Sequence, residues 1–577
     1  MLYTLLKQYG RPYYRQVSLV VLMVLVQSIA NLYLPNLNAD LINHGIAVGN
    51  LGYIWRVGGI MLGVTLLVGI FALVGIYYAS QSSMGIGKDI RGAVFRQVQH
   101  FSQRDMNHFG TPSLITRNTN DVQQIQIFLQ MALTIMVAGP IMLVGGVAMA
   151  LYEDARLSLL LVVNVPLIAL VIWIMLVKAI PLFRTMQVRI DRINTVLREQ
   201  ITGVRVIRAF IRTRYEQERF ETANQDLTTT TLRVNRIFVF AMPSMMAIMN
   251  LSYVAVLWFG GHLVGGGSMP IGNMTAFLNY ILLVLMAVMM STMMVILLPR
   301  AAASAARLQE VLETVPSVAE AKDPVEPASA TGTVSFEGVT FAYPGGERPV
   351  LQDLAFSLSP GRTTAIVGGT GAGKTTLINL IARFYDVTAG RLLVDGVDVR
   401  SLRLERLWNS LGLVPQAAYL FAGTIRENVL FGNPDAPDDE IWRALEVAQA
   451  KDFVRAMPDG LDTAIDQGGT NVSGGQRQRL SIARALVRQR PILLFDDCFS
   501  ALDAATDARL RQALRSAAAG STLVIVAQRV STILHADLII VLEDGRVVGT
   551  GTHQELLATC PQYRELVQSQ LGEGAAS

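Results

Sequence analysis

The stretch Gly368-Gly-Thr-Gly-Ala-Gly-Lys-Thr375 lies between a short apolar run and a segment of helical periodicity. The run before it, Thr363-Thr-Ala-Ile-Val367, has the composition of a β-strand, and 376–383 has apolar residues at helical spacing. Glycines in this pattern let backbone N–H groups wrap around phosphate oxygens in front of a helix N-terminus. The expected structure is therefore a strand, a phosphate-binding loop and a helix, a far more specific signal than a lone glycine-rich turn.

Two side chains of this loop have predicted chemical roles. Lys374 is expected to neutralise the β and γ oxygens of a nucleotide, and the hydroxyl of Thr375 can ligate Mg²⁺. Lys374 is therefore a candidate catalytic residue as well as a binding residue. The candidate nucleotide-binding residues of the segment are Gly368, Gly369, Thr370, Gly371, Ala372, Gly373, Lys374, Thr375 and Thr376.

A second apolar run, Ile492-Leu-Leu-Phe495, ends in two aspartates, Asp496 and Asp497. A strand here lifts Asp496 to the sheet edge, where its carboxylate can hold Mg²⁺ through water. Asp497 then lies near the γ-phosphate, where hydrolysis needs a general base. Two adjacent aspartates alone would more often form a helix cap or a solvated pair, but the phosphate loop upstream favours the catalytic interpretation.

A third motif, Ser473-Gly474-Gly475-Gln476, enters a basic helical segment. A hydroxyl and free N–H groups at a helix N-terminus make a second anion site. One nucleotide has one γ-phosphate, and the first loop already holds it. The second site is therefore predicted to serve a nucleotide bound to another subunit.

The N-terminal half is a different kind of sequence. Of the 577 residues, 51% are hydrophobic and 16% are charged, against about 25% charged in ordinary soluble proteins. Six apolar runs each have about the 20 residues needed to cross a bilayer, so six transmembrane helices are expected. The alternatives, a very apolar soluble core or a cleavable signal peptide for the first run, fit less well. The runs are 17–34, 57–78, 127–152, 157–177, 237–264 and 274–298.

Lysine and arginine are concentrated before the first run and in two long loops, 81–126 and 180–235. The other loops are short and nearly free of positive charge, with Arg56 and Arg156 at their edges. The positive-inside rule places both termini, both long loops and the C-terminal domain in the cytoplasm; the family resemblance described below implies a bacterial-type inner membrane. The long loops have helical periodicity; they are either self-packed hairpins or levers that contact a soluble domain.

The predicted fold class is a multidomain membrane protein: a six-helix, all-α transmembrane domain followed by an α/β nucleotide-binding domain. The expected transmembrane domain is 1–315, and 316–330 is a linker rich in proline, alanine and glutamate. Residues 331–577 are expected to form the α/β domain with a largely parallel sheet. Two cysteines, Cys498 and Cys560, exclude a disulfide framework and a cysteine-based metal site.

Over essentially its whole length the chain resembles a half-transporter of the ATP-binding cassette (ABC) exporters. Ser473 to Gln476 matches the signature motif of that family. The resemblance implies that ATP and Mg²⁺ are cofactors, that Gln416 senses Mg²⁺ and that Tyr343 stacks on adenine. It further implies that Asp503, in Ser500-Ala-Leu-Asp503, crosses to the opposite subunit. The coupling segments are then expected near 107–113 and 210–218, the second docking into the nucleotide domain of the partner.

Two positions depart from the family pattern. Active members carry glutamate where this chain has Asp497, and histidine where it has Gln528. Aspartate is shorter by one methylene, and a misplaced general base can cost on the order of 10²-fold in rate. The departures resemble the degenerate subunit of a heterodimeric exporter, whose own site binds ATP but turns it over poorly. Neutral drift, with Asp497 acting through an extra water, is the alternative.

Substrate and partners are expectations of the same resemblance. The predicted partners are a second half-transporter, membrane lipid and a hydrophobic or amphipathic substrate such as a drug or lipid, and nucleic acid is not among them. Methionines suit a surface for varied apolar ligands, although lipid-facing packing explains them equally. Two other functions stay open: an ATP-gated or regulatory membrane protein, and uptake on an exporter-like fold. The methionines are Met242, Met245, Met246, Met249, Met286, Met289, Met290, Met293 and Met294.

Overall fold

The computed structural model describes residues 1–327 and 330–571, with the backbone alone at 241–242, 292–296 and 571. Residues 1–99 and 112–314 form one compact unit, and residues 100–111 belong with those from 315 onward in a second unit. The two units are described separately below. A short segment of the first predicted cytoplasmic loop is thus part of the C-terminal unit.

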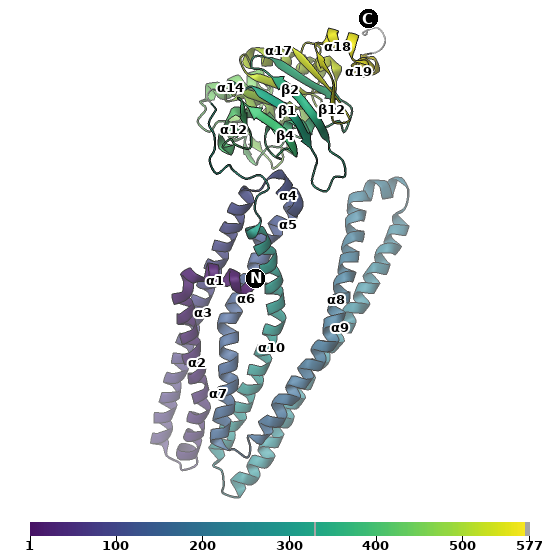
Figure 1. The fold of residues 1–577 in the computed structure, drawn as a ribbon. Helices are drawn as coiled ribbons and strands as arrows, with labels where there is room; N and C mark the ends of the chain where they lie inside the picture. Colours follow the sequence, from purple (N-terminus) through teal and green to yellow (C-terminus); the bar gives the residue numbers. More distant parts are fainter. Residues whose placement is uncertain (328–329, 572–577) are drawn as a thin grey trace. The chain divides into compact units, whose positions relative to one another are not determined.

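The first unit is made of long helices (Figure 1). Six of its described helical segments are long and apolar enough to span a membrane, as predicted. The helices continue well beyond the apolar runs, so the long loops are helical extensions of the membrane segments. The helices are α1 Leu2–Gly10, α2 Tyr14–Asp40, α3 Leu51–Gln99, α5 Thr111–Thr116, α6 Val122–Met131, α7 Val137–Glu153, α8 Leu159–Ala209, α9 Thr213–Gly265 and α10 Ile271–Glu313.

The third apolar run, 127–152, was expected as one helix, but a wide turn of π-helix, η4 Ala132–Met136, divides it between α6 and α7. A second such turn, η3 Arg117–Asp121, lies before the run and separates α5 from α6. Pro140 in α7 has no N–H to donate to the carbonyl of Met136, which is where η4 ends. Single turns of π-helix within longer helices are frequent at functional sites.

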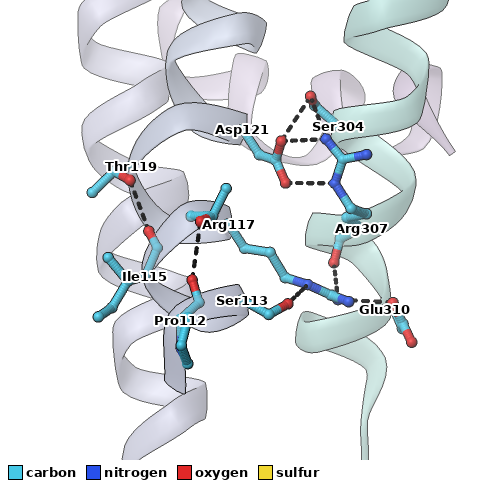
Figure 2. Close-up of polar contacts among 10 residues, drawn as sticks. Pro112, Ser113, Ile115, Arg117, Thr119, Asp121, Ser304, Arg307 and Glu310 are labelled. Atoms are coloured by element: carbon cyan, nitrogen blue, oxygen red, sulfur yellow. Dashed lines mark hydrogen bonds and ion pairs between the residues drawn. The ribbon is translucent and has the colours of Figure 1, made fainter. Parts of the chain in front are cut away.

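The turn η3 is fixed to α10 by buried charge (Figure 2). The Asp121 side chain is fully buried; its carboxylate accepts hydrogen bonds from Arg307 Nε at 2.8 Å and Ser304 Oγ at 3.0 Å. Arg117 Nη1 donates to the Arg307 carbonyl at 2.8 Å and to Glu310 Oε2 at 2.7 Å. A buried carboxylate is stabilised only when it is paired and hydrogen-bonded, so these contacts hold the C-terminal part of α10 against the α5–η3 segment.

The hairpin of α8 and α9 ends in a three-residue tip, Phe210–Arg212. Phe210 and Ile211 are 73% and 87% exposed. Ile211 has φ of 55°, a left-handed conformation that β-branched residues rarely adopt. Below the tip, Arg189 Nη1 and Asp226 Oδ2 form an ion pair at 2.6 Å that ties the two helices together.

The second unit contains a six-stranded sheet in the order β12-β11-β3-β10-β9-β6, parallel except for β12. This confirms the expected α/β domain with a largely parallel sheet. The central strands β9 and β10 are buried along their whole length, as strands covered on both faces are. The strands are β3 Thr363–Gly368, β6 Leu411–Val414, β9 Ile492–Asp496, β10 Thr522–Val526, β11 Leu538–Glu543 and β12 Arg546–Gly551.

A four-stranded antiparallel sheet, in the order β2-β1-β4-β5, was not predicted. Its ladders contain bulges, including one beside Gly338 in β1, which interrupt the alternation that marks a strand. These strands are β1 Val334–Phe341, β2 Leu351–Leu358, β4 Ala389–Val394 and β5 Val397–Asp398; β7 Gly423–Thr424 pairs with β8 Ala464–Ile465.

In Figure 1 strands β1, β2 and β4 face the viewer with no helix in front of them, and the second unit also contains helices. They are α4 Gln103–Phe109, α11 Lys374–Ile381, α12 Leu404–Ser410, α13 Ile425–Leu430, α14 Asp438–Val447, α15 Lys451–Ala456, α16 Gly474–Leu486, α17 Ala504–Ala517, α18 His553–Thr559 and α19 Pro561–Leu571.

Candidate nucleotide-binding site

The glycine loop joins β3 to α11, as the sequence predicts, and α11 begins at Lys374. Gly373 has φ of 99°, and a Cβ there would lie 2.5 Å from the Leu351 side chain. Only glycine fits that position. Gly369 and Thr370 are exposed, whereas Ala372 and Thr376 are buried. The loop therefore presents its outer backbone to solvent in front of the N-terminus of α11, the arrangement that binds phosphate.

Lys374 folds back over this loop. Its Nζ donates to the carbonyl oxygens of Gly368 at 2.8 Å and Gly369 at 2.7 Å. Burial lowers the pKa of Lys374, while the carboxylates of Asp497 and Asp496 act in the opposite direction. Phosphate oxygens would give the ammonium stronger partners than neutral carbonyls, because both members of the hydrogen bond would then be charged.

Asp496 ends strand β9 as predicted and faces the loop. Its Oδ1 accepts a hydrogen bond from Thr375 Oγ1 at 3.1 Å, and the residue is 4% exposed. Burial raises the pKa of Asp496. A hydroxyl and a carboxylate at this separation are hard oxygen donors, and they fit Mg²⁺ completed by water and phosphate oxygens. A bound dication would favour the ionised carboxylate over the neutral form.

Asp497 is held differently. Its carboxylate accepts a hydrogen bond from Gln416 Nε2 at 3.4 Å; burial raises its pKa, while Gln416 and the backbone of Gln528 act in the opposite direction. Its own N–H donates to the Val526 carbonyl at 3.0 Å. The residue has φ of 44°, a conformation that aspartate tolerates better than longer side chains. The structure thus brings the candidate catalytic residues Lys374 and Asp497 together with the three candidate metal-site residues, Thr375, Gln416 and Asp496. The side chain of the third catalytic candidate, Gln528, is exposed.

Tyr343 lies beside the start of α11, where its hydroxyl shares a hydrogen bond of 3.0 Å with Thr376 Oγ1. Its ring meets that of Tyr385 edge-on, with centroids 5.3 Å apart. Tyr385 was not predicted from the sequence. Its hydroxyl accepts a hydrogen bond from Asn107 Nδ2 on α4 at 3.3 Å. Two contacts therefore connect Tyr343 to the segment predicted as the first coupling element.

A second contact fixes α4 in the same unit. The Asp105 carboxylate accepts from the backbone N–H groups of Ser317 and Ser102, each at 3.0 Å. Burial alone would raise the pKa of Asp105, but the hydrogen bonds from Ser317 and Ser102 outweigh it and lower the pKa. The helix is thus anchored by an ionised side chain to the chain that follows α10.

The signature turn lies at the N-terminus of α16. Ser473 Oγ accepts the Gln476 N–H at 3.2 Å, and Gln476 Oε1 accepts the Ser473 N–H at 2.9 Å. Ser473 and Gly474 are exposed, and Gly475 is half-buried. Within the described residues, no hydrogen bond joins this turn to the glycine loop. Asp503 is also exposed; its Oδ1 accepts the Thr506 N–H at 2.9 Å and caps α17.

Comparison with known proteins agrees with this geometry. Residues 17–288 match the ABC transporter transmembrane region, and residues 351–500 match the ABC transporter family. An uncharacterised ABC transporter ATP-binding protein of Mycobacterium tuberculosis is 47% identical, covering 99% of this chain and 98% of that protein. An ATP-dependent lipid A-core flippase of Syntrophus aciditrophicus is 34% identical over 84% of this chain and 80% of its own length.

Among solved structures, a bacterial Atm1-family ABC exporter with ATP bound has the same fold. Its TM-score is 0.79 at 23% identity, with 97% of this chain and 98% of that chain covered. The two family regions also occur here in one chain, with six membrane-spanning helices before an ATP-binding domain. The chain belongs to the ABC transporter family and has the organisation of an exporter half-transporter.

Proposed function

We propose that this half-transporter works in a heterodimer, binds ATP at a degenerate site of its own, and exports hydrophobic or amphipathic compounds such as drugs or lipids. The observation that carries the proposal is Asp497, a short carboxylate at the position where the general base is needed. It follows the predicted metal-binding Asp496, and the neutral side chain of Gln528 stands where the family has histidine.

In this proposal the chain's own residues bind ATP well and hydrolyse it slowly. The glycine loop and Lys374 hold the phosphates, and Thr375 with Asp496 holds Mg²⁺, which neutralises phosphate charge when bound. The Asp497 carboxylate is held by its hydrogen bond from Gln416 Nε2 at 3.4 Å. A base displaced by about 1 Å from the attacking water can lose on the order of 10²-fold in rate.

The exposed signature turn then completes a second site on the partner. Hydroxyl and N–H groups at a helix N-terminus bind the γ-phosphate of a nucleotide held by the other subunit. Closure of the two domains over ATP creates contacts that are absent when they are apart. That difference in interaction free energy is what can shift the membrane helices, and hydrolysis at the partner's site releases it.

Two features support the proposed coupling to the membrane domain. Helix α4 is held by Asp105 to Ser317 and by Asn107 to Tyr385. The tip Phe210–Arg212 offers exposed apolar side chains, which suit docking into the partner's nucleotide domain. The first segment would therefore respond to this chain's domain and the second to the partner's.

The proposed substrate class rests on composition and on one relative. The relative from Syntrophus is named a lipid A-core flippase. The side chains of Met246, Met286 and Met290 are exposed. Methionine side chains are flexible and can adapt to varied apolar ligands. Met245 and Met249, by contrast, pack into a core of the helical unit. The side chains of Met242, Met293 and Met294 lie outside the described residues. We place the protein in a bacterial inner membrane, with both termini and the ATP-binding domain in the cytoplasm.

The deciding experiment compares the purified full chain with the chain co-purified with a second half-transporter that carries the glutamate and the histidine. The chain alone should retain ATP and hydrolyse it slowly, and the pair should hydrolyse it briskly. Brisk hydrolysis by the chain alone would refute the heterodimer. A pair that binds ATP without hydrolysis would favour an ATP-gated membrane protein, and the direction of transport in inverted vesicles distinguishes export from uptake.

A further inference from the structure

Helix α19, Pro561–Leu571, is fixed to the second unit along one face. Tyr563 and Val567, four residues apart, are both fully buried in the core that also contains Val530. The Tyr563 hydroxyl is 2.8 Å from Nδ1 of His553, and burial raises the pKa of Tyr563 to about 12. Gln570 lies three residues beyond Val567, so it continues the same helical face. The buried anchors therefore determine where its side chain can reach.

The Gln570 side chain makes two hydrogen bonds to one backbone turn. Its Oε1 accepts the N–H of Val530 at 2.8 Å, and its Nε2 donates to the carbonyl of Gln528 at 2.8 Å. A carboxamide can do this because it has a donor and an acceptor side by side. The strand before the turn is held as well, since the N–H of Asp497 donates to the Val526 carbonyl at 3.0 Å.

A different part of α19 faces the glycine loop. A cavity of about 440 Å³ is lined by the loop from Gly368 to Ala372, by the end of β11 and by α19. The α19 residues at this cavity are Gln562, Glu565, Leu566 and Ser569. Helix α19 therefore borders both the glycine loop, which would hold the phosphates, and the turn at Gln528, which would contact the γ-phosphate.

We propose that Gln570 is a positioning residue of the ATP site: by clamping the backbone at Gln528 and Val530, it sets the turn that distinguishes ATP from ADP. The inference rests on the proposed function, because the place of Gln528 beside the γ-phosphate belongs to that proposal. Only ATP has a γ-phosphate, so a loosened turn should weaken ATP binding and leave ADP binding unchanged. A purely structural role would affect the two nucleotides alike.

The test measures ATP and ADP affinities of the purified full chain by displacement of a fluorescent nucleotide. Gln570→Ala should lower the ATP-to-ADP affinity ratio about fivefold to tenfold, the effect of losing two hydrogen bonds of ordinary strength. ADP affinity should stay within about twofold of the wild type. Gln570→Glu keeps the acceptor for Val530 but sets a carboxylate oxygen against the Gln528 carbonyl, so it should lower the ratio at least as much as Gln570→Ala.

Two controls separate the possible results. Gln568→Ala changes an exposed glutamine on the same helix and should leave the ratio unchanged. Lys374→Ala should weaken the binding of both nucleotides.

If Gln570→Ala weakens the binding of ATP and ADP equally, or matches Gln568→Ala, the positioning role is overturned while the site itself stands. If Lys374→Ala leaves both affinities unchanged, the proposed function fails and the inference with it. Thermal unfolding checks that Gln570→Ala is folded, and Gln570→Glu decides the question if it is not.

Discussion

The glycine loop and the signature turn both lie at helix N-termini of one domain, but they differ in the contacts that they make with the rest of the chain. The side chains of the loop are hydrogen-bonded within the chain. Lys374 Nζ donates to the loop carbonyls, and Thr375 Oγ1 donates to the Asp496 carboxylate. The turn forms a capping box between Ser473 and Gln476 and is otherwise open to solvent at Ser473 and Gly474. The difference fits the proposed roles, in which the first binds a nucleotide within one chain and the second contacts a nucleotide that another subunit presents.

The sharpest test of this difference is a change at the signature turn. Gly475→Asp adds a carboxylate, beside the Ala501 carbonyl, to the turn that is proposed to bind the γ-phosphate, but leaves the capping pair Ser473 and Gln476 in place. Steady-state phosphate release by the assembled pair should fall about 100-fold, because a site for developing negative charge would then repel it. ATP retention at this chain's own glycine loop should persist. Undiminished phosphate release would contradict the role assigned to the turn.

A smaller loss is expected at the glycine loop itself. Lys374→Ala removes the only side-chain ammonium assigned to the phosphates and should reduce ATP retention by this chain at least tenfold, since charge-assisted hydrogen bonds are lost. Turnover of the pair should fall less than for Gly475→Asp, because the proposed function assigns most of the hydrolysis to the partner's site. Parallel equilibrium binding and phosphate-release assays measure both quantities. A larger turnover loss than at Gly475 would reverse the proposed division.

Removing the degenerate acid should matter less again. Asp497→Ala should change turnover of the pair within about threefold, since a misplaced carboxylate contributes little as a general base. Asp496→Ala is the matched comparison one residue earlier, and it should impair ATP binding by removing the partner of Thr375. Equal turnover losses for Asp497→Ala and Gly475→Asp would show that this chain's own site is catalytically competent.

The smallest expected effect is on stability and concerns the backbone conformation at Asp497. Asp497 has φ of 44°, and Asp497→Glu should lower the free energy of unfolding by about 1 kcal/mol, because longer side chains disfavour that conformation. Asp497→Asn tolerates the left-handed region and serves as the control. Thermal unfolding of both variants measures the difference. A stability equal to wild type for Asp497→Glu would mean that restoring the acid carries no backbone cost.

Local patterns in the sequence predicted the six membrane helices, the parallel sheet and the order strand, glycine loop, helix. These features depend on neighbours in the chain, such as apolar run length and the spacing from Gly368 to Thr375. The contacts of Asn107 with Tyr385, and of Gln570 with the turn at Gln528, were beyond prediction. They join single polar residues far apart in sequence, and neither residue of such a pair signals the other. The sequence signal at Tyr385 is only that it is an aromatic four residues after the end of α11.

The conformation of Ile211 has a consequence for how the protein must be made. A left-handed backbone costs a β-branched residue about 1 to 2 kcal/mol, a strain that glycine would avoid. Two apolar side chains, Phe210 and Ile211, are instead exposed just after the C-terminus of the 51-residue helix α8. Apolar surface of this kind promotes adhesion between molecules. Under the proposed heterodimer, copies synthesised in excess of the partner chain are expected to aggregate, so the cell would need balanced production of the two chains.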